Sequence, residues 1–198
     1  MHDMISCIKK ELVSRKEYVK NNTIKTIYFG GGSPSILSKD DIKTILHTIY
    51  ENYKVCKKSE ITLEANPDDL SKQKLTDFLT IGINRLSIGV QSFKDENLVF
   101  LNRTHSRKDA LGSIKKAQDI GYKNISVDLI YGLPGQSLKD WESNLNLLFS
   151  LNVQHFSSYI LTLEKKTKLF EYVKKNKVKM LDEINIINQY NSLLKMSK

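Results

Sequence analysis

Residues 26–34 read TIYFGGGSP, a short run of β-branched and aromatic residues that ends in three glycines, a serine and a proline. The run predicts a β-strand, because such side chains favour extended backbone. Residues 38–49 follow with apolar residues three and four positions apart, which is typical of an amphipathic helix. A strand, a glycine turn and a helix in this order form the first part of a βαβ unit.

The same theme recurs along the chain. Strand-like runs are expected at five places: residues 26–29, 61–64, 86–91, 125–130 and 156–160. Amphipathic helical patterns lie between them; Ser38 and Asp41 form a plausible capping box, and Gly82 and Gly121 stand where helices should end. Strands that alternate with helices predict an α/β protein with a parallel sheet. A doubly wound sheet and a (β/α) barrel both fit this pattern.

Both ends of the pattern look unfinished. The chain opens in a helical pattern over residues 4–12 with no strand before it, and it closes with another over residues 181–194. A complete barrel needs more than five strands, so we expect a partial one. The strand that starts at Thr26 would then be a sheet edge, with Ile27 and Phe29 poorly covered. No repeat or linker divides the sequence, so residues 1–198 are expected to form a single domain.

Composition excludes several classes of protein. The net charge is +9, but the lysines are spread along the chain, so a solvated surface is a better explanation than a nucleic-acid site. No apolar run is long enough to cross a bilayer and no signal-peptide core is present, so a cytoplasmic protein is expected. Cys7 and Cys56 are far apart and His105 has no second ligand at a suitable spacing, so no metal site is predicted.

In parallel α/β folds, ligands bind at the carboxyl ends of the strands. Gly31, Gly32 and Ser33 follow the first predicted strand, where backbone N–H groups could approach a ligand closely. A flexible strand-to-helix turn is the alternative explanation of these glycines.

Four polar residues lie near the ends of later strands or between helices. Glu64 and Gln91 end the second and third strands, and Asp128 lies in an apolar strand, where a carboxylate is costly without a partner. Arg103 lies between two helical stretches, and its guanidinium could bind a carboxylate at two points. Each residue also has a plainer explanation as a solvated or structurally paired group. Together they suit a zwitterionic ligand that carries hydroxyl groups.

Several segments resemble one protein family, in the same order and at compatible spacing over nearly the whole chain. They are TIYFGGGSPS (26–35), LEANP (63–67), RLSIGVQSF (85–93), NRTH (102–105) and DLIYGLPGQ (128–136). These segments resemble the oxygen-independent coproporphyrinogen III oxidase-like family of radical S-adenosylmethionine (SAM) proteins. The stretch SSYILTLE (157–164) resembles the heme-chaperone branch of that family.

The resemblance implies an incomplete radical-SAM (β/α) barrel, similar to a partial TIM barrel, that binds S-adenosylmethionine. It assigns the methionine end of the cofactor to Gly31, Gly32 and Ser33, its ammonium to Glu64 and its carboxylate to Arg103. It assigns the ribose hydroxyls to Gln91 and Asp128, and the adenine side to Ile160. Heme or porphyrin would be the small-molecule ligand, and a heme-accepting protein a possible partner.

The sequence departs from the family pattern at both ends. The family begins with a strand and a C-x-x-x-C-x-x-C loop whose thiolates bind a [4Fe-4S] cluster, and this chain has neither. Cys7 lies in the first predicted helix and cannot replace that loop. The smaller C-terminal domain of the family is also absent. We therefore expect a core domain that lacks the first strand with its cluster loop and the C-terminal domain.

Four functional hypotheses remain open. The first is a heme-chaperone-like fragment with an S-adenosylmethionine pocket but no cluster ligands. The second is an oxygen-independent coproporphyrinogen III oxidase-like oxidoreductase, which this chain alone could not complete. The third is a non-radical barrel protein that binds a nucleotide or phosphate at residues 30–32, and the fourth is a product without function.

Overall fold

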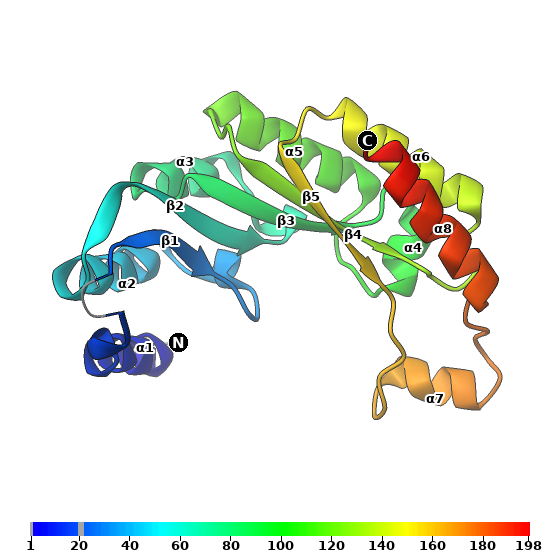
Figure 1. Ribbon diagram of the computed structural model, residues 1–198, viewed down its shortest axis with the longest axis horizontal. Coiled ribbons are helices and arrows are strands. Elements are labelled where there is room, and N and C mark those ends of the chain that lie inside the picture. Colours follow the sequence, from blue (N-terminus) through cyan, green and yellow to red (C-terminus); the bar gives the residue numbers. More distant parts are fainter. Residues whose placement is uncertain (1, 20–21) are drawn as a thin grey trace.

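The computed structural model describes residues 2–19 and 22–198, which form one curved, five-stranded parallel sheet (Figure 1). Strands neighbouring in sequence are neighbours in the sheet, in the order β1-β2-β3-β4-β5. The strands are β1 (Ile24–Phe29), β2 (Val55–Ala65), β3 (Arg85–Gln91), β4 (Ile125–Tyr131) and β5 (His155–Ile160). All five predicted strands are confirmed, and β2 begins six residues before its predicted start.

Helices connect the strands and frame the sheet. The α-helices are α1 (His2–Ser14), α2 (Lys39–Asn52), α3 (Lys72–Thr80), α4 (Asp95–Phe100), α5 (Arg107–Ile120), α6 (Leu138–Ser150), α7 (Lys168–Lys174) and α8 (Glu183–Met196). Short 3₁₀ helices are η1 (Lys16–Val19), η2 (Pro34–Ile36) and η3 (Pro67–Asp69). The predicted capping box is present, since the Ser38 side chain accepts from the Asp41 N–H and the Asp41 carboxylate accepts from the Ser38 N–H. Gly121 ends α5 with a φ of +112°.

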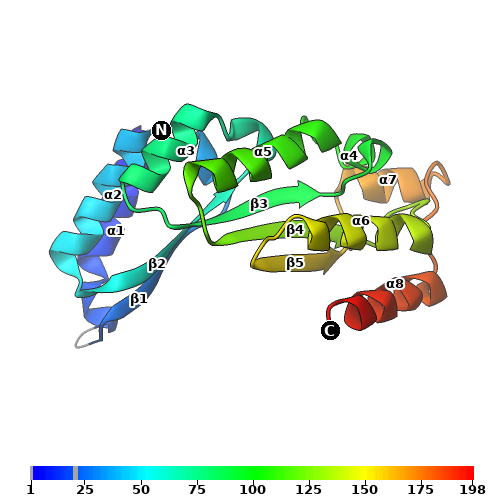
Figure 2. The same ribbon diagram turned by 90° about the horizontal axis from the view of Figure 1, so that it is seen from above.

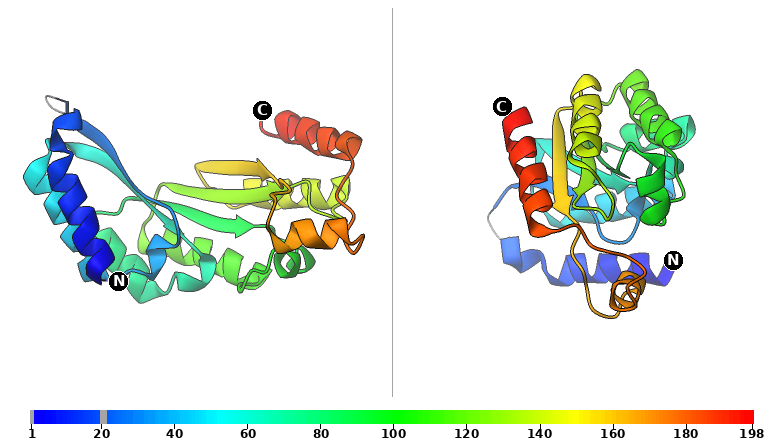
Figure 3. Two further views of the ribbon diagram at one scale, coloured as in Figure 1. Left: turned by 90° about the horizontal axis from the view of Figure 1, so that it is seen from below. Right: turned by 90° about the vertical axis from the view of Figure 1, so that its right-hand side faces the viewer.

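The sheet curls like part of a barrel wall. Helices α2, α3, α5 and α6 cover its convex face, while the concave face is left open by them (Figure 2). A doubly wound sheet would carry helices on both faces, so the barrel alternative is the correct one. Helix α1 packs on α2 at one end of the sheet, and α8 packs on α6 towards the other (Figure 3).

The third strand shows how one sequence serves both faces of the sheet. Leu86, Ile88 and Val90 are fully buried, whereas Ser87 and Gln91 alternate with them and line a cavity on the opposite side. Successive side chains of a strand point to opposite faces, so every second residue of β3 enters the core beneath the helices. The alternation separates the hydrophobic core from the polar concave face.

The first strand is an outer strand of the described sheet, as expected. The prediction that Ile27 would be poorly covered is wrong, because Ile27 is only 9% exposed and belongs to the main hydrophobic core. Phe29 is partly buried and packs against the same core. The edge therefore exposes backbone groups and the side chain of Tyr28 rather than the apolar residues named from the sequence.

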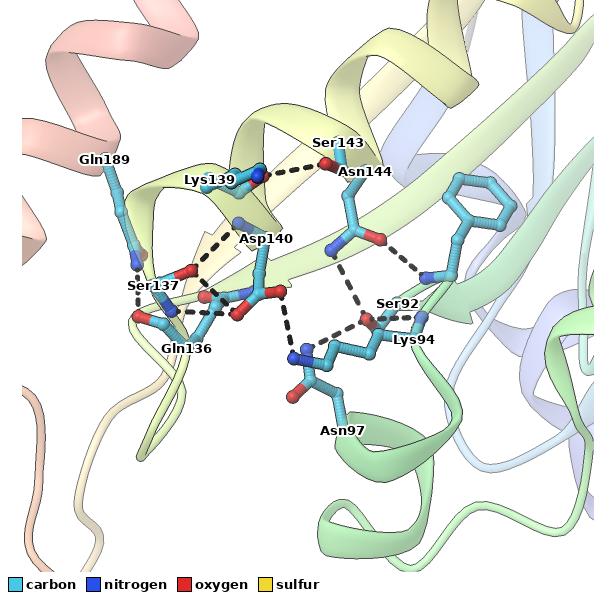
Figure 4. A network of polar contacts seen from close by, with 11 residues as sticks. Ser92, Lys94, Asn97, Gln136, Ser137, Lys139, Asp140, Ser143, Asn144 and Gln189 are labelled. Carbon is cyan, nitrogen blue, oxygen red and sulfur yellow. Dashed lines mark hydrogen bonds and ion pairs between the residues drawn. The ribbon is translucent and has the colours of Figure 1, made fainter.

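Helix α8 is fastened to the turn after β4 by a single buried glutamine. The side-chain oxygen of Gln189 accepts from the Gly132 N–H at 2.8 Å. Its amide nitrogen donates to the Gln136 carbonyl at 3.0 Å (Figure 4). The Trp141 indole N–H donates to the Gln189 carbonyl at 3.0 Å, so the same residue also ties α8 to α6. These bonds hold the Gly132–Gln136 turn beside the end of β4.

A second buried network joins the end of β3 to α6. The Asn144 side chain accepts from the Phe93 N–H at 2.9 Å, and the hydroxyl of Ser92 accepts from the amide of Asn97 at 3.1 Å (Figure 4). At its rim, Lys94 and Asp140 form an ion pair at 2.9 Å. The segment that follows Gln91 is thus fixed on the side away from the concave face.

Candidate functional site

The carboxyl ends of the strands enclose a polar cavity of about 210 Å³. Its lining residues come from the loop after β1, the end of β2 and the residue after it, the middle and end of β3, the middle of β4, and the α4–α5 loop. They are Gly32, Ser33, Pro34, Glu64, Ala65, Asn66, Ser87, Gly89, Gln91, Arg103 and Asp128. Glu64, Gln91, Arg103 and Asp128, the four polar residues singled out from the sequence, all line this one cavity.

The three glycines after β1 serve two different purposes. Gly31 and Gly32 have φ values of +78° and +63°, a backbone region that residues other than glycine rarely adopt. A Cβ at either position would meet no atom within 4 Å, so conformation rather than space requires glycine there. At Gly30 a Cβ would lie 2.7 Å from the Tyr28 ring, so space is the requirement. The glycines thus form a shaped turn beside the cavity.

Glu64 is held from two sides. Its Oε2 accepts from the Gly31 N–H at 3.1 Å and its Oε1 accepts from the Tyr28 hydroxyl at 2.9 Å. Partial burial, and then the bond to Glu64, raise the pKa of the Tyr28 hydroxyl above its ordinary value of 10.0, which already keeps it a proton donor at neutral pH. Tyr28 was missed as a site residue. The signal for it was its place two residues before Gly30, on the strand face opposite the buried Ile27.

Arg103 reaches the cavity from the loop between α4 and α5. Its Nη2 donates to Asn66 Oδ1 at 2.6 Å and to the Gly89 carbonyl at 3.0 Å. The Asn66 amide in turn donates to the Ser33 hydroxyl at 3.2 Å. Asn66 was also missed, although its position after Glu64 and before Pro67 marked it as a strand-end residue. It links the arginine to the glycine turn.

Asp128 is the partly buried carboxylate that the sequence required to have a partner. The hydroxyl of Ser87 on the neighbouring strand donates to both carboxylate oxygens at 3.3 Å. Burial raises the pKa of the Asp128 carboxyl, while bonds from Ser87 and Ser157 partly oppose that shift. The polar character of Ser87 on an otherwise apolar strand was the signal that sequence reasoning overlooked.

Gln91 ends β3 with a φ of +67°, an unusual value for a residue other than glycine. Its side-chain amide folds back towards Gly89, where an added Cβ would lie 2.8 Å from Gln91 Nε2 and 3.5 Å from Arg103 Nη2. Gly89 therefore makes room for both side chains.

Ile160 is not brought into this cavity. It ends β5 in register with Tyr131, is 41% exposed and lies near Gly132. Its predicted contact with adenine stays a prediction.

The two cysteines do not approach a cluster-binding arrangement. Cys7 lies exposed on α1, and Cys56 lies near the amino end of β2. Cys56 lies eight steps along the strand from Glu64, which corresponds to about 26 Å. Across residues 2–19 and 22–198, no group of three His, Cys, Asp or Glu side chains could hold a metal ion. The residues present here therefore do not fit a [4Fe-4S] cluster.

No helix in the described part of the chain is long and apolar enough to span a membrane.

Comparison with known proteins gives consistent relatives. The chain is 38% identical over 177 residues to the heme chaperone HemW of Bacillus subtilis. The matched region covers 89% of this chain and 47% of that protein. It is 36% identical over 165 residues to HemW of Escherichia coli, with 83% and 44% coverage. It is 37% identical to the mitochondrial radical S-adenosyl methionine domain-containing protein 1 of Danio rerio, with 94% and 42% coverage. The chain spans about half the length of these relatives.

The solved structure of coproporphyrinogen III oxidase from Escherichia coli, a radical SAM enzyme, superposes with a TM-score of 0.81. The superposed region covers 96% of this chain and 44% of the oxidase chain. The sequence identity over it is 24%, so the likeness concerns the fold. The Radical SAM superfamily profile matches residues 8–148. The predicted partial radical-SAM barrel and the resemblance to heme chaperones and coproporphyrinogen oxidase-like proteins are confirmed, and the chain belongs to the radical SAM superfamily.

Proposed function

We propose that this chain is the S-adenosylmethionine-binding core of a heme-chaperone-like radical SAM protein. One observation carries the proposal: a carboxylate, a guanidinium, an amide and a second, partly buried carboxylate line one cavity on the parallel sheet. The names of the relatives support the heme-chaperone assignment, and the superfamily supports the cofactor. Residues 1–198 would act as one domain, and a cytoplasmic location is part of the same proposal.

The polar groups of the cavity fit S-adenosylmethionine by charge and hydrogen-bonding type. Glu64 would accept from the ammonium, and Arg103 would pair with the carboxylate, since its guanidinium is already oriented by Asn66 and Gly89. Gln91 and Asp128 would bind the ribose hydroxyls. Gly31, Gly32 and Ser33 would line the methionine end, and Ile160 the adenine side.

The cavity is smaller than the 300–1,000 Å³ that is usual for small-molecule sites. At about 210 Å³ it would enclose part of the cofactor and leave the remainder on the open concave face. When it is bound at a reduced cluster, S-adenosylmethionine supplies a 5′-deoxyadenosyl radical. Because these residues do not provide the cluster ligands, the role proposed for this chain does not include radical cleavage of the cofactor.

Heme or porphyrin is the small-molecule cargo that we propose, with a heme-accepting protein as the partner. The similarity to proteins named heme chaperones, at 36–38% identity, favours this role over the oxidase reaction. The match to the oxidase structure is a match of folds, so it favours neither activity. Titration of the purified chain with hemin, followed by visible absorption, would test heme binding: a saturable Soret shift is expected, and its absence would contradict a heme site within these residues.

Calorimetric titration with S-adenosylmethionine tests the cofactor site. We expect one site, weakened at least about tenfold by Glu64→Gln, since a hydrogen bond to a charged group contributes about 1.5–3 kcal/mol. Glu142→Gln is a matched control, because Glu142 lies on α6 and bonds Ser192 of α8 away from the cavity. No heat of binding to the wild-type chain, or equal affinities for wild type and Glu64→Gln, would contradict the proposal.

A further inference from the structure

The loop that carries Arg103 also carries a buried histidine that the cavity does not use. His105 is 3% exposed and lies two residues beyond Arg103, in the loop between α4 and α5. Its Nε2 lies 3.0 Å from the Val90 carbonyl oxygen, while Arg103 donates to the preceding carbonyl, that of Gly89. Two side chains of one loop thus bind two consecutive carbonyls at the end of β3.

The backbone at this point leaves the regular strand. Between the pairs Ile88–Val127 and Gln91–Leu129 the register of β3 against β4 shifts, so that β3 contains one residue more than β4. This is the pattern of a β-bulge, which interrupts the ladder of hydrogen bonds locally. The Val90 carbonyl instead accepts from the Ser92 N–H at 2.8 Å.

That bond closes a three-residue turn with Gln91 at its centre. Gln91 has a φ of +67°, which corresponds to the rare and strained form of such a turn. Strained backbone persists when surrounding contacts hold it, and it concentrates at binding sites. His105 supplies the second donor to the carbonyl that closes the turn.

The protonation state of His105 suits this task. Its Nδ1 is buried without a hydrogen-bond partner among the described residues. With Nε2 as the donor, Nδ1 is a bare acceptor, and a second proton there would be buried without a partner. Burial lowers the pKa of the imidazole, the bond to Val90 opposes that shift, and the nearby Arg103 charge adds to it, so that the pKa lies below its ordinary value. The ring is therefore a neutral donor at Nε2.

We propose that His105 is a positioning residue, which fixes the Val90 carbonyl and hence the strained turn that aims Gln91 and Arg103 at the cavity. This inference rests on the proposed cofactor site, because Gln91 and Arg103 are two of its binding groups. His105 itself does not line the cavity. Its effect on the ligand is exerted through the end of β3.

Two substitutions separate positioning from general packing. In His105→Gln the amide nitrogen falls where Nε2 stands and keeps a donor for Val90. In His105→Asn the shorter amide falls where Nδ1 stands and cannot reach. Similar polarity and burial make the pair a matched test. His47→Gln and His47→Asn are controls, because His47 is exposed on α2 and pairs with Glu51.

The measurements are the hydrogen exchange rate of the Ser92 amide and the affinity for S-adenosylmethionine. We expect His105→Asn to accelerate Ser92 exchange and to weaken binding by about tenfold, as loss of one buried hydrogen bond would. His105→Gln should stay within about threefold of wild type in both. Thermal melts of each variant identify any general loss of stability.

Equal Ser92 exchange in the Gln and Asn variants would overturn the inference, whatever their melting temperatures. So would accelerated Ser92 exchange in His105→Asn with unchanged affinity for S-adenosylmethionine. Failure of the wild-type chain to bind would instead overturn the proposed function, and the Ser92 exchange rates would still decide whether His105 holds the turn.

Discussion

Arg103 illustrates how a single side chain can be prepared for a ligand before it arrives. One of its nitrogens is committed to Asn66 and to the Gly89 carbonyl, which fixes the plane of the guanidinium at the rim of the cavity. Both N–H groups of Nη2 are then used, and the three that remain on Nε and Nη1 are held in a fixed plane for a carboxylate, whereas a lysine ammonium has no such plane.

We predict that Arg103→Ala weakens S-adenosylmethionine binding more than Arg103→Lys. The expected loss is about 10–100-fold for alanine, because charge-assisted bonds contribute about 1.5–3 kcal/mol, and several-fold less for lysine. Calorimetric titration of both variants measures the difference. Arg107→Ala is a suitable control, since Arg107 lies at the start of α5 outside the cavity lining. Equal losses for alanine and lysine would remove the two-point role of the guanidinium.

We expect Asp128 to lower the stability of the folded chain at neutral pH while it strengthens ligand binding. Folding raises the pKa of its carboxyl, so the folded chain binds this proton more tightly than the unfolded chain does. The contribution to stability is therefore present at low pH and is lost as the pH rises through the raised pKa. We predict that Asp128→Asn increases the free energy of unfolding at pH 7 but has little effect once the carboxyl is protonated. The same change should weaken S-adenosylmethionine binding.

Denaturant titrations of wild type and Asp128→Asn at several pH values, together with calorimetry, measure both effects. Asp119→Asn is the control, because Asp119 is an exposed residue on α5 paired with Lys115. A variant that is less stable than wild type at pH 7 would show that Ser87 and Ser157 more than offset the burial of the carboxylate.

At the scale of elements, α8 depends on few polar contacts. Gln189 is 1% exposed and bonds both the N–H of Gly132 and the carbonyl of Gln136. Replacing it leaves two backbone groups without their partner in a buried place, and each such group costs about 1–3 kcal/mol.

We predict that Gln189→Leu lowers the free energy of unfolding by about 2–4 kcal/mol and accelerates exchange of the Gly132 amide. Asn188→Leu, on the exposed side of the same helix, should change stability little. Denaturant unfolding and amide exchange measure the two effects. An unchanged Gly132 exchange rate would show that α8 is held by its apolar contacts instead.

The strands and most helices could be predicted because local signals agreed with the fold. Ser38 and Asp41 formed the expected cap and Gly121 the expected helix end, since both depend on neighbouring residues. The first six residues of β2, from Val55 to Glu60, were missed because they are mostly polar, and β1 alone among the strands pairs with them. Helix α7 has seven residues, too few to show an apolar period.

The main residues of the candidate site could be predicted from the sequence, but the hydrogen bonds between them could not. The place of Glu64 and Gln91 near strand ends follows from the chain itself, because parallel strands end at one edge of a sheet. That Asn66 holds Arg103, and that Ser87 faces Asp128, depends on contacts between residues 37 and 41 positions apart. No local pattern encodes such pairings.

At the scale of the whole molecule, the described sheet has two outer strands, β1 and β5. On β5, Tyr159 and Ile160 are 57% and 41% exposed, beside backbone groups that no further strand pairs. Exposed edges of this kind favour association between chains. The β5 edge therefore has the features of a strand that can pair with a strand of a second chain.

We predict concentration-dependent self-association, detectable by sedimentation velocity over a wide range of concentrations. Ile160→Lys should reduce this self-association, because a charge on an edge strand opposes its pairing with a strand of another chain. Tyr190→Lys is the matched control, since Tyr190 is 46% exposed on α8 and not on a strand. A single species of monomer mass at all concentrations would contradict the prediction.

We also predict that anaerobic reconstitution with iron and sulfide leaves no stoichiometric [4Fe-4S] cluster on these 198 residues. The sequence contains two cysteines, and they lie on α1 and near the amino end of β2. Fusing an upstream segment that bears C-x-x-x-C-x-x-C should recover the cluster absorption. Close to four irons per unfused chain, with cleavage of S-adenosylmethionine, would contradict this prediction.

The glycine turn after β1 has a consequence for the chirality of the residues it can accept. At Gly31 and Gly32 there is open space where a Cβ would stand, so the obstacle to a side chain is the handedness of the amino acid. D-Alanine, introduced by chemical ligation, favours positive φ and should destabilise the turn less than L-alanine, whose backbone would be strained there. At Gly30 the obstacle is space, because the ring of Tyr28 lies where an L side chain would stand. Saturation mutagenesis should therefore recover asparagine at positions 31 and 32 and only glycine at position 30.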